Sequence, residues 1–325
     1  MGRIALVFGG AGFIGSHLLT YLAATGEYDG LFSADLAEPR FRVPGVNYEQ
    51  VDVREPIPEH LAPGATEIYN LAAVHTTPGH EDWEYYWTNV LGATHVVDFS
   101  RKRAIYNMVF TSSIAVYGPS ETLKDEDAPL DAESAYGRSK LAAEKIHSLW
   151  QAESPESRRL VIVRPAVIYG YTERGNFTRL AGLLRRRRFV FPGRTDTIKA
   201  CGYVEDLVGS MRWVLDLGLP ATTYNFCHPT RYTMAEICAA FSQVAGYAPA
   251  NIVMPLYPML FAGWLFEKAA SVGLRTSINR ARVMKLVRSN NISPKRLSEL
   301  GYPYRYNLEE SLRKWQNESP THHFD

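Results

Sequence analysis

The chain of 325 residues contains little cysteine and shows no pattern for metal binding. Its three cysteines, Cys201, Cys227 and Cys238, form no CxxC pair and no cysteine–histidine spacing typical of zinc sites. Such sparse cysteine is usual in a reducing compartment. The chain also begins directly on a strand-like run, with no room for a signal peptide before it. We therefore expect a cytoplasmic protein without a structural metal.

The sequence has no excess of positive charge and no unbroken apolar run of membrane-spanning length. A net charge of +1 at pH 7 argues against nucleic acid as a partner. Residues 237–266 carry no charged side chain, but Pro249, Pro255 and Pro258 interrupt them, and a spanning helix needs about 20 continuous apolar residues. We expect no transmembrane segment here, and interpret these residues as a buried part of a second lobe. The alternative is an apolar surface for a substrate, a membrane or a partner.

Strand-like and helical patterns alternate through the first half of the chain. The strand-like runs cover residues 4–8, 31–34, 67–71, 108–111 and 160–163, and helical patterns begin near Phe13, Asp82 and Ala135. This alternation predicts βαβ units, and hence an α/β fold with a doubly wound parallel sheet of the Rossmann type. After Gly170 the composition changes, so we place the end of the first domain there and expect a smaller C-terminal α/β lobe to follow. Residues 317–325 look unpacked.

A glycine motif joins the first predicted strand to the first predicted helix. Gly9, Gly12 and Gly15 follow at intervals of three residues. A strand, a glycine turn and a helix in this order present backbone N–H groups and a helix N-terminus to a pyrophosphate. Together with Asp35 at the end of the next apolar run, the motif predicts a nicotinamide-dinucleotide site.

The acidic residue after the second strand indicates which dinucleotide binds. Asp35 stands where a carboxylate accepts hydrogen bonds from both adenosine ribose hydroxyls and repels a 2′-phosphate. We therefore expect NAD to be preferred over NADP. Arg40 and Arg42 lie close by in the sequence and could weaken that preference, although a position on the surface is the commoner state of such side chains.

Tyr136 and Lys140 form a candidate pair for proton transfer. They are four residues apart, so on a helix their side chains share one face. A free tyrosine has a pKa near 10, and a neighbouring ammonium favours its phenolate. The tyrosine can then take a proton from a substrate hydroxyl.

These motifs and several others resemble the extended short-chain dehydrogenase/reductase family, which includes NAD-dependent nucleotide-sugar 4-epimerases, dehydratases and 4-ketoreductases. The matching segments occur in the order that the family shows. They are Gly9-x-x-Gly12-x-x-Gly15, Asp52-Val53, Asn70-Leu-Ala-Ala73, Asn89-Val-x-Gly92, Thr111-Ser-Ser-Ile-Ala-Val-Tyr-Gly118, Tyr136-x-x-x-Lys140, Arg164-Pro-x-x-x-Tyr-Gly170 and Tyr203-Val-Glu-Asp-Leu207.

The resemblance implies an arrangement of domains and a cofactor site. Residues 1–170, with 201–220 returning to them, would form the NAD-binding Rossmann domain, and residues 171–200 and 221–325 the substrate-binding lobe. Asp52 and Val53 would hold the adenine, while Leu71, Ala72 and Ala73 would line the pyrophosphate and ribose. The other residues that we expect to bind NAD are the glycines of the loop, Phe13, Ile14, Asp35, Asn89, Tyr136, Lys140 and Pro165.

The resemblance also assigns catalytic roles. Ser113 would hydrogen-bond the reacting sugar oxygen, with Ser112 and Thr111 as structural competitors, and Lys140 would also bind the nicotinamide ribose. Family members that dehydrate the sugar place an acid directly after this serine. Here Ile114 and Ala115 follow, and neither transfers a proton, so we do not expect a 4,6-dehydratase.

The substrate side matches the family less well. His75 falls where related enzymes bring a side chain near the sugar, and a structural histidine is an equal alternative. Asn176 and Phe177 match a position that contacts the nucleotide. Lys199 stands where an arginine commonly meets the diphosphate, and a lysine lacks bidentate geometry. Val167 replaces an asparagine that also contacts phosphate. The basic run 185–188 either supplies the missing contacts or is a solvated helix end.

We therefore expect an NAD-dependent enzyme that acts at C4 of a nucleotide-diphosphate sugar, as a UDP-hexose 4-epimerase does. The alternatives are a 4-keto-sugar reductase, which uses the same residues, and a hydroxysteroid- or isoprenoid-type dehydrogenase, which the apolar segment 237–266 favours. A non-catalytic dinucleotide sensor would have no use for Tyr136. A helix with Trp83, Tyr86 and Trp87 on one broad face corresponds to the dimer interface of the family, so we expect a homodimer.

Overall fold

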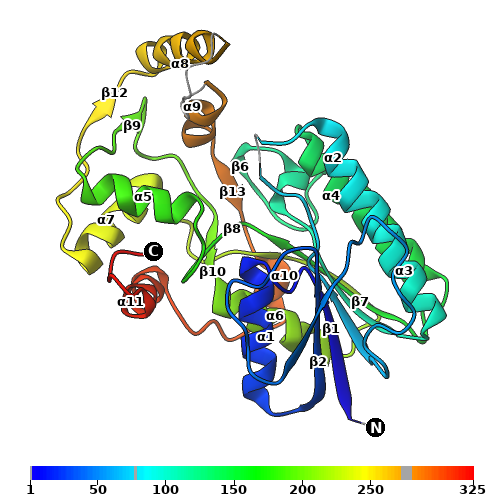
Figure 1. Cartoon of the computed structure of the whole chain (residues 1–325). Coiled ribbons are helices and arrows are strands. Elements are labelled where there is room, and N and C mark those ends of the chain that lie inside the picture. Colours follow the sequence, from blue (N-terminus) through cyan, green and yellow to red (C-terminus); the bar gives the residue numbers. More distant parts are fainter. Residues whose placement is uncertain (1, 77–78, 272–279) are drawn as a thin grey trace.

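A seven-stranded parallel sheet forms the centre of the molecule (Figure 1), in a computed structural model that describes residues 2–76, 79–271 and 280–325. The strand order is β11-β7-β5-β4-β1-β2-β3, and every neighbouring pair runs parallel. The strands are β1 (Arg3–Phe8), β2 (Tyr28–Asp35), β3 (Val46–Gln50), β4 (Glu67–Asn70), β5 (Asn107–Thr111), β7 (Arg159–Pro165) and β11 (Ala221–Phe226). The doubly wound fold and all five predicted strands are confirmed.

Helices cover both faces of this sheet because its strands are apolar on both sides. Ala5 and Val7 of β1 pack toward α1 (Phe13–Thr25) and α6 (Val204–Asp216), whereas Leu6 and Phe8 pack toward α3 (Gly92–Lys102) and α4 (Ala135–Ala152). Two short helices, α2 (Asp82–Tyr86) and the π-helix η1 (Trp87–Leu91), precede α3. The strand order reverses between β1 and β4, which is where open α/β sheets bind ligands.

The second lobe is built from helices and short two-stranded sheets. It contains α5 (Asn176–Arg185), β9 (Phe191–Pro192), α7 (Met234–Ala245), β12 (Val253–Met254), α8 (Leu256–Ser271), α9 (Arg280–Val287) and α11 (Leu308–Glu318). β12 pairs with β9. Two more short sheets, β8 (Val167–Tyr169) with β10 (Cys201–Tyr203) and β6 (Ser120–Lys124) with β13 (Asn290–Ile292), join segments far apart in the sequence.

The return of the chain to the first lobe is longer than predicted. We placed its end at residue 220, but β11 follows and pairs with β7 as the edge strand of the main sheet. The helix α10 (Lys295–Glu299) then packs against β11, so a part of the expected substrate lobe also lies on the first domain. The sequence of β11, ATTYNF, is half polar because an edge strand needs less apolar surface. It therefore lacks the apolar run by which the other strands were predicted.

The uncharged segment 237–266 divides into two parts. Ile237, Cys238 and Phe241 on α7 are buried, as predicted. The prediction of burial is wrong for β12 and α8, where most of the large apolar side chains are exposed. Within the described residues, no helix is long and apolar enough to cross a membrane.

Most residues of the C-terminal segment 317–325 are exposed, but two of them are buried, in contrast to our prediction of an unpacked tail. α11 continues to Glu318, and the Phe324 side chain is fully buried. Its ring lies 4.9 Å from that of Phe241 on α7 and 5.1 Å from that of Trp315 on α11. One aromatic residue in a polar tail was too weak a signal to predict this contact.

Removing the Phe324 ring tests this packing. Phe324→Ala should lower the free energy of unfolding by about 3–5 kcal/mol, the usual cost of truncating a buried phenylalanine. Thr321→Ala, at an exposed position of the same tail, should cost well under half of that. Urea unfolding of the two variants and the wild type measures the difference, and equal stabilities would contradict a packed C-terminus.

Candidate functional site

The glycine loop between β1 and α1 lies at the reversal point of the sheet, where two backbone approaches require glycine. Gly9 has φ +77°, and a Cβ there would lie 2.8 Å from the backbone nitrogen of Ala72. A Cβ on Gly15 would lie 2.2 Å from the carbonyl oxygen of Gly9. Gly12 caps α1 with no side chain to accept a hydrogen bond from the first turn, which holds Phe13 and Ile14. The helix N-terminus can therefore receive a pyrophosphate.

Asp35, the last residue of β2, is tied to this loop. One carboxylate oxygen accepts a hydrogen bond from the backbone N–H of Ala11 at 3.0 Å, and the other accepts from that of Ala37 at 3.0 Å. The two nearby arginines have partners elsewhere. Arg40 donates to the carbonyl oxygen of Thr172, and Arg42 pairs with Glu38 at 3.2 Å. This arrangement suits the ribose hydroxyls of NAD.

The loop after β4 is held in place by Asn89. The Asn89 side chain accepts from the Val74 N–H at 2.9 Å, and donates to the Val74 carbonyl at 3.1 Å and to the Ser139 hydroxyl at 2.9 Å. These bonds fix the chain beyond Leu71, Ala72 and Ala73. Asn89 lies in the π-helix η1, a rare element often found at functional sites. Its predicted contact with the cofactor stays a prediction.

The other residues predicted to bind the cofactor lie at the ends of strands or just beyond them. Asp52 follows β3, and its two carboxylate oxygens accept from Arg54 at 2.8 Å and 2.6 Å, which lowers the pKa of this carboxyl. Val53 is buried beside Gly92, and Pro165 is the buried last residue of β7.

Ser113 and Tyr136 meet above the carboxyl end of β5. Ser113 is the N-cap of the 3-10 helix η2 (Ile114–Tyr117), and Tyr136 lies in the first turn of α4. A hydrogen bond between the two side chains lowers the pKa of the Tyr136 hydroxyl, while burial, the larger effect, raises it. The competitor Ser112 is buried and donates to Glu144 at 2.5 Å instead. Ser112 is therefore engaged in the interior, and the predicted contact of Ser113 with a sugar oxygen stays a prediction.

Lys140 lies one helical turn beyond Tyr136, in an apolar setting. Its ammonium is 4.3 Å from the centre of the Phe110 ring, and burial lowers its pKa to about 7, against the opposing effect of the Glu144 carboxylate. Glu144 is itself held by a buried ion pair with Arg164 at 2.7 Å. Pattern analysis gave no role to Glu144, although its position four residues after Lys140 was a signal that it shares the same helix face.

The residues predicted to bind substrate are less clearly assembled. His75 is exposed beyond the β4 loop, and Asn176 begins α5, where its side-chain oxygen accepts from Arg179 at 3.1 Å. The Phe177 ring is buried and stacked on Tyr169 at 4.4 Å, so only its backbone is left to contact a ligand. The basic run 185–188 is exposed at the end of α5.

Lys199 binds backbone carbonyl groups at the end of a helix. Its buried ammonium donates to the carbonyl oxygens of Lys285 at 2.5 Å and Arg288 at 2.6 Å, at the C-terminus of α9. Cations stabilise this end of a helix. Burial lowers the pKa of Lys199 to about 8. Because two of its three donors are engaged, one remains for the predicted diphosphate contact.

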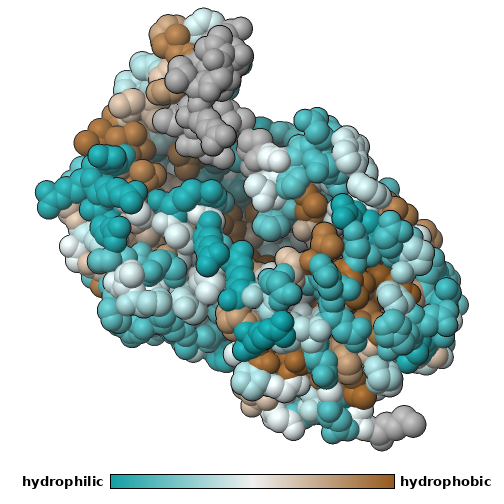
Figure 2. All heavy atoms as spheres, viewed as in Figure 1, coloured by the Kyte–Doolittle hydropathy of each residue, from teal (hydrophilic) through white to brown (hydrophobic). Residues whose placement is uncertain are grey.

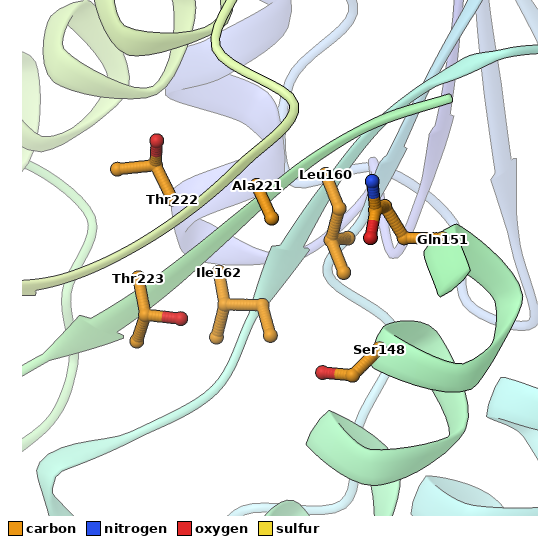
Figure 3. Close-up of a pocket in the computed structure, with 7 residues that line it drawn as sticks. All are labelled: Ser148, Gln151, Leu160, Ile162, Ala221, Thr222 and Thr223. Atoms are coloured by element: carbon orange, nitrogen blue, oxygen red, sulfur yellow. The ribbon is translucent and has the colours of Figure 1, made fainter. Parts of the chain in front are cut away.

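A small cavity lies at the other edge of the sheet (Figure 3). Ser148 and Gln151 of α4 face the first residues of β7 and β11 across a space of about 60 Å³. Ligand pockets usually enclose about 300 Å³ or more, and the amino ends of the strands lie opposite the glycine loop. This cavity is therefore separate from the candidate site. Among the described residues, no group of His, Cys, Asp or Glu side chains is placed to hold a metal ion.

Comparisons with known proteins identify the family and the fold of the chain. The sequence model of the NAD dependent epimerase/dehydratase family matches residues 5–227. The chain is 27% identical to N-acetyl-alpha-D-glucosaminyl-diphospho-ditrans,octacis-undecaprenol 4-epimerase of Escherichia coli O157:H7, over 94% of this chain and 92% of that protein. Its fold is similar to MoeE5 in complex with UDP-glucose and NAD, with a TM-score of 0.75, 21% identity, and coverage of 98% and 99%. It is also similar to UDP-glucose 4-epimerase of Thermus thermophilus in complex with NAD, with a TM-score of 0.74, 22% identity, and coverage of 96% and 97%.

The buried lysine predicts a pH dependence of stability. In the cofactor-free folded protein Lys140 loses its proton near pH 7, whereas in the unfolded chain it keeps the proton to about pH 10. The unfolded state thus binds more protons between these values, so this group contributes stability that is full above about pH 10 and is lost as the pH falls toward 7. The free energy of unfolding of the wild type, relative to Lys140→Met, should rise with pH across this window.

Urea unfolding of cofactor-free protein at several pH values measures this difference. Lys145→Met, which removes a lysine outside the buried face of the same helix, is the matched control and should track the wild type. If the difference between the wild type and Lys140→Met is the same at pH 7 and pH 10, the ammonium is not desolvated in the folded state.

Proposed function

The chain belongs to the NAD-dependent epimerase/dehydratase family of extended short-chain dehydrogenases/reductases, and from this premise we propose that it inverts C4 of a hexose linked through a diphosphate, as UDP-hexose 4-epimerases do. The observation that carries the proposal is the hydrogen bond between Ser113 and Tyr136, with Lys140 one helical turn beyond Tyr136 and no acidic residue at positions 114 and 115. This set can move one proton at a single hydroxyl, and C4 epimerisation needs no other proton transfer.

Each of the three residues has its own role at the C4 hydroxyl of the sugar. Tyr136 accepts the proton of the C4 hydroxyl, and Ser113, which already hydrogen-bonds Tyr136, holds the same oxygen. Lys140, one turn away, favours the phenolate whenever it carries its proton. The glycine loop would hold NAD, which would supply an acceptor and donor for the C4 hydride. Epimerisation then requires the 4-keto sugar to rotate in the site, so that the opposite face of C4 receives the hydride. Tyr136 would return its proton to the C4 oxygen in the same step.

The diphosphate joins the sugar to a second group, for which there are two candidates. A nucleoside is the first candidate, with contacts from the start of α5 and from Lys199. The name of the Escherichia coli relative, which is similar over nearly the whole chain, contains a polyprenol instead. The exposed apolar side chains of β12 and α8 favour this second candidate. Either carrier leaves the chemistry at C4 unchanged.

Two further properties belong to the same proposal. Trp83, Tyr86 and Trp87 are exposed on α2 and η1, and Leu149 is exposed on the neighbouring α4. This apolar face supports a homodimer, for which the solution mass of the purified chain is the test. The three cysteines are buried and free, as expected in a reducing compartment, and we propose that the enzyme works in the cytoplasm.

Incubation with UDP-glucose, UDP-galactose and their N-acetylamino counterparts tests the activity. Each substrate of the enzyme should reach equilibrium with its C4 epimer without added NADH, as measured by chromatography. Tyr136→Phe should lower kcat by about 10²–10⁴-fold, because it deletes the proton acceptor, while NAD affinity stays close to that of the wild type. Tyr106→Phe, at an exposed and remote position, is the matched control.

Two outcomes would contradict the assignment. Turnover only of 4-keto sugars, with NADH consumed in proportion, would identify a reductase. Unchanged epimerisation by Tyr136→Phe would exclude the proposed proton acceptor.

A further inference from the structure

An exposed apolar surface covers the tip of the second lobe. We define the β12–α8 surface as Ile252, Val253, Met254, Tyr257, Phe261, Trp264, Leu265 and Phe266, all of them exposed. Tyr257 is 84% and Phe261 is 61% accessible to solvent, unusually high values for aromatic side chains. Figure 2 shows apolar residues gathered over β12 and α8, and Figure 1 places α8 at the edge of the molecule. Adjacent apolar side chains exposed in this number indicate a binding surface.

The arrangement on α8 is that of a helix lying on an apolar phase. Tyr257, Phe261, Trp264 and Leu265 follow helical spacing and share one face, whereas Phe266 is exposed away from that face and Gly263 is buried. The Phe261 and Trp264 rings lie 5.8 Å apart. Aromatic residues are enriched where hydrocarbon meets water. The 16 residues of α8 are fewer than the roughly 20 that a spanning helix needs, so this geometry fits insertion parallel to a membrane surface.

The charges that follow this surface in the sequence favour an anionic lipid over a second protein. Between residues 237 and 298 the sequence has one acidic residue, Glu267, which pairs with Arg280 at 2.8 Å. Over residues 268–288 it has six basic residues, of which Arg280 is paired in this way and Arg288 pairs with Glu133 at 2.7 Å. The whole chain is nearly neutral, with a formal charge of +1, so this concentration is local. Basic residues beside an apolar helix are attracted to anionic headgroups.

The surface is connected to the candidate active site through few elements. α9 follows α8 in the chain, and Lys199 holds the C-terminal carbonyls of α9. β13 comes next and pairs with β6, which begins three residues after η2 ends at Tyr117. Ser113 is the N-cap of η2. In the order of the chain, the surface is therefore linked to Ser113 through α9, β13, β6 and η2.

We propose that the β12–α8 surface binds the surface of a membrane that contains anionic phospholipid. The aromatic side chains enter the boundary between headgroups and acyl chains, and the local excess of basic residues draws this part of the chain to the headgroups. The consequence for substrate rests on the proposed function: a sugar diphosphate carried on a membrane-embedded lipid would reach the site from this side, without leaving the membrane.

Co-sedimentation of the full chain with vesicles tests the proposal. The wild type should bind vesicles of phosphatidylcholine and phosphatidylglycerol, and should bind vesicles of phosphatidylcholine alone more weakly. Tyr257→Ser/Phe261→Ser should lower the partition coefficient by about tenfold or more, because it removes two aromatic contacts with the lipid. Leu123→Ser/Leu219→Ser, which removes two exposed apolar side chains elsewhere, should bind as the wild type does.

Three results would overturn the proposal. The first is no binding of vesicles by the wild type, and the second is equal binding by both double variants. The third is a mass in solution that falls by half in Tyr257→Ser/Phe261→Ser, which would identify a second copy of the chain as the occupant. The rate at which this variant epimerises a water-soluble UDP-hexose separates the proposal of membrane binding from the proposed function. If turnover is retained while vesicle binding is lost, both proposals stand. If the protein binds vesicles but epimerises neither a UDP-hexose nor a polyprenol-linked sugar diphosphate, only the proposed function fails.

Discussion

The cost of burying charge at the carboxyl edge of the sheet shapes this structure more than any other constraint. Arg164 and Glu144 form a buried ion pair at 2.7 Å, and the buried Lys140 ammonium lies one helical turn before Glu144, over the Phe110 ring. Removing either partner of the Arg164–Glu144 pair would cost several kcal/mol, because the other charge would stay buried and unpaired. Arg164 also donates to the Tyr117 hydroxyl at 2.7 Å, which donates to Asn225 at 2.9 Å. One polar network thus ties together β7, α4, η2 and β11, the elements that position Ser113 and Tyr136.

The second lobe is attached to this network by similar contacts. Tyr169 at the end of β8 bonds His228 at 2.8 Å and Ser311 of α11 at 2.6 Å, and Lys199 holds the end of α9. The Arg40 contact with Thr172 joins the region beyond β2 to the loop that leads into α5. These bonds cross between segments that are distant in the sequence. They hold the second lobe in a defined position relative to the first domain.

Sequence patterns predicted the parts of the fold that depend on local chemistry. The glycine loop, the five apolar strands and the helix with Tyr136 and Lys140 each have a short-range signature, because a backbone approach or a helix face demands particular residues. β11 and the burial of Phe324 have none, since each depends on a partner far along the chain. For the same reason the sequence could not reveal that Lys199 caps α9, or that α8 turns its aromatic face outward.

The most direct measurement of the central claim follows the hydrogen at C4. A UDP-hexose that the enzyme turns over is labelled with deuterium at C4 and incubated with the NAD-bound protein in ordinary water. If one hydride leaves C4 and returns to it while Tyr136 handles only the hydroxyl proton, the C4 epimer keeps its deuterium in full by mass spectrometry. Replacement of the label by hydrogen from water would contradict this account, because C4 would then exchange a proton and not a hydride.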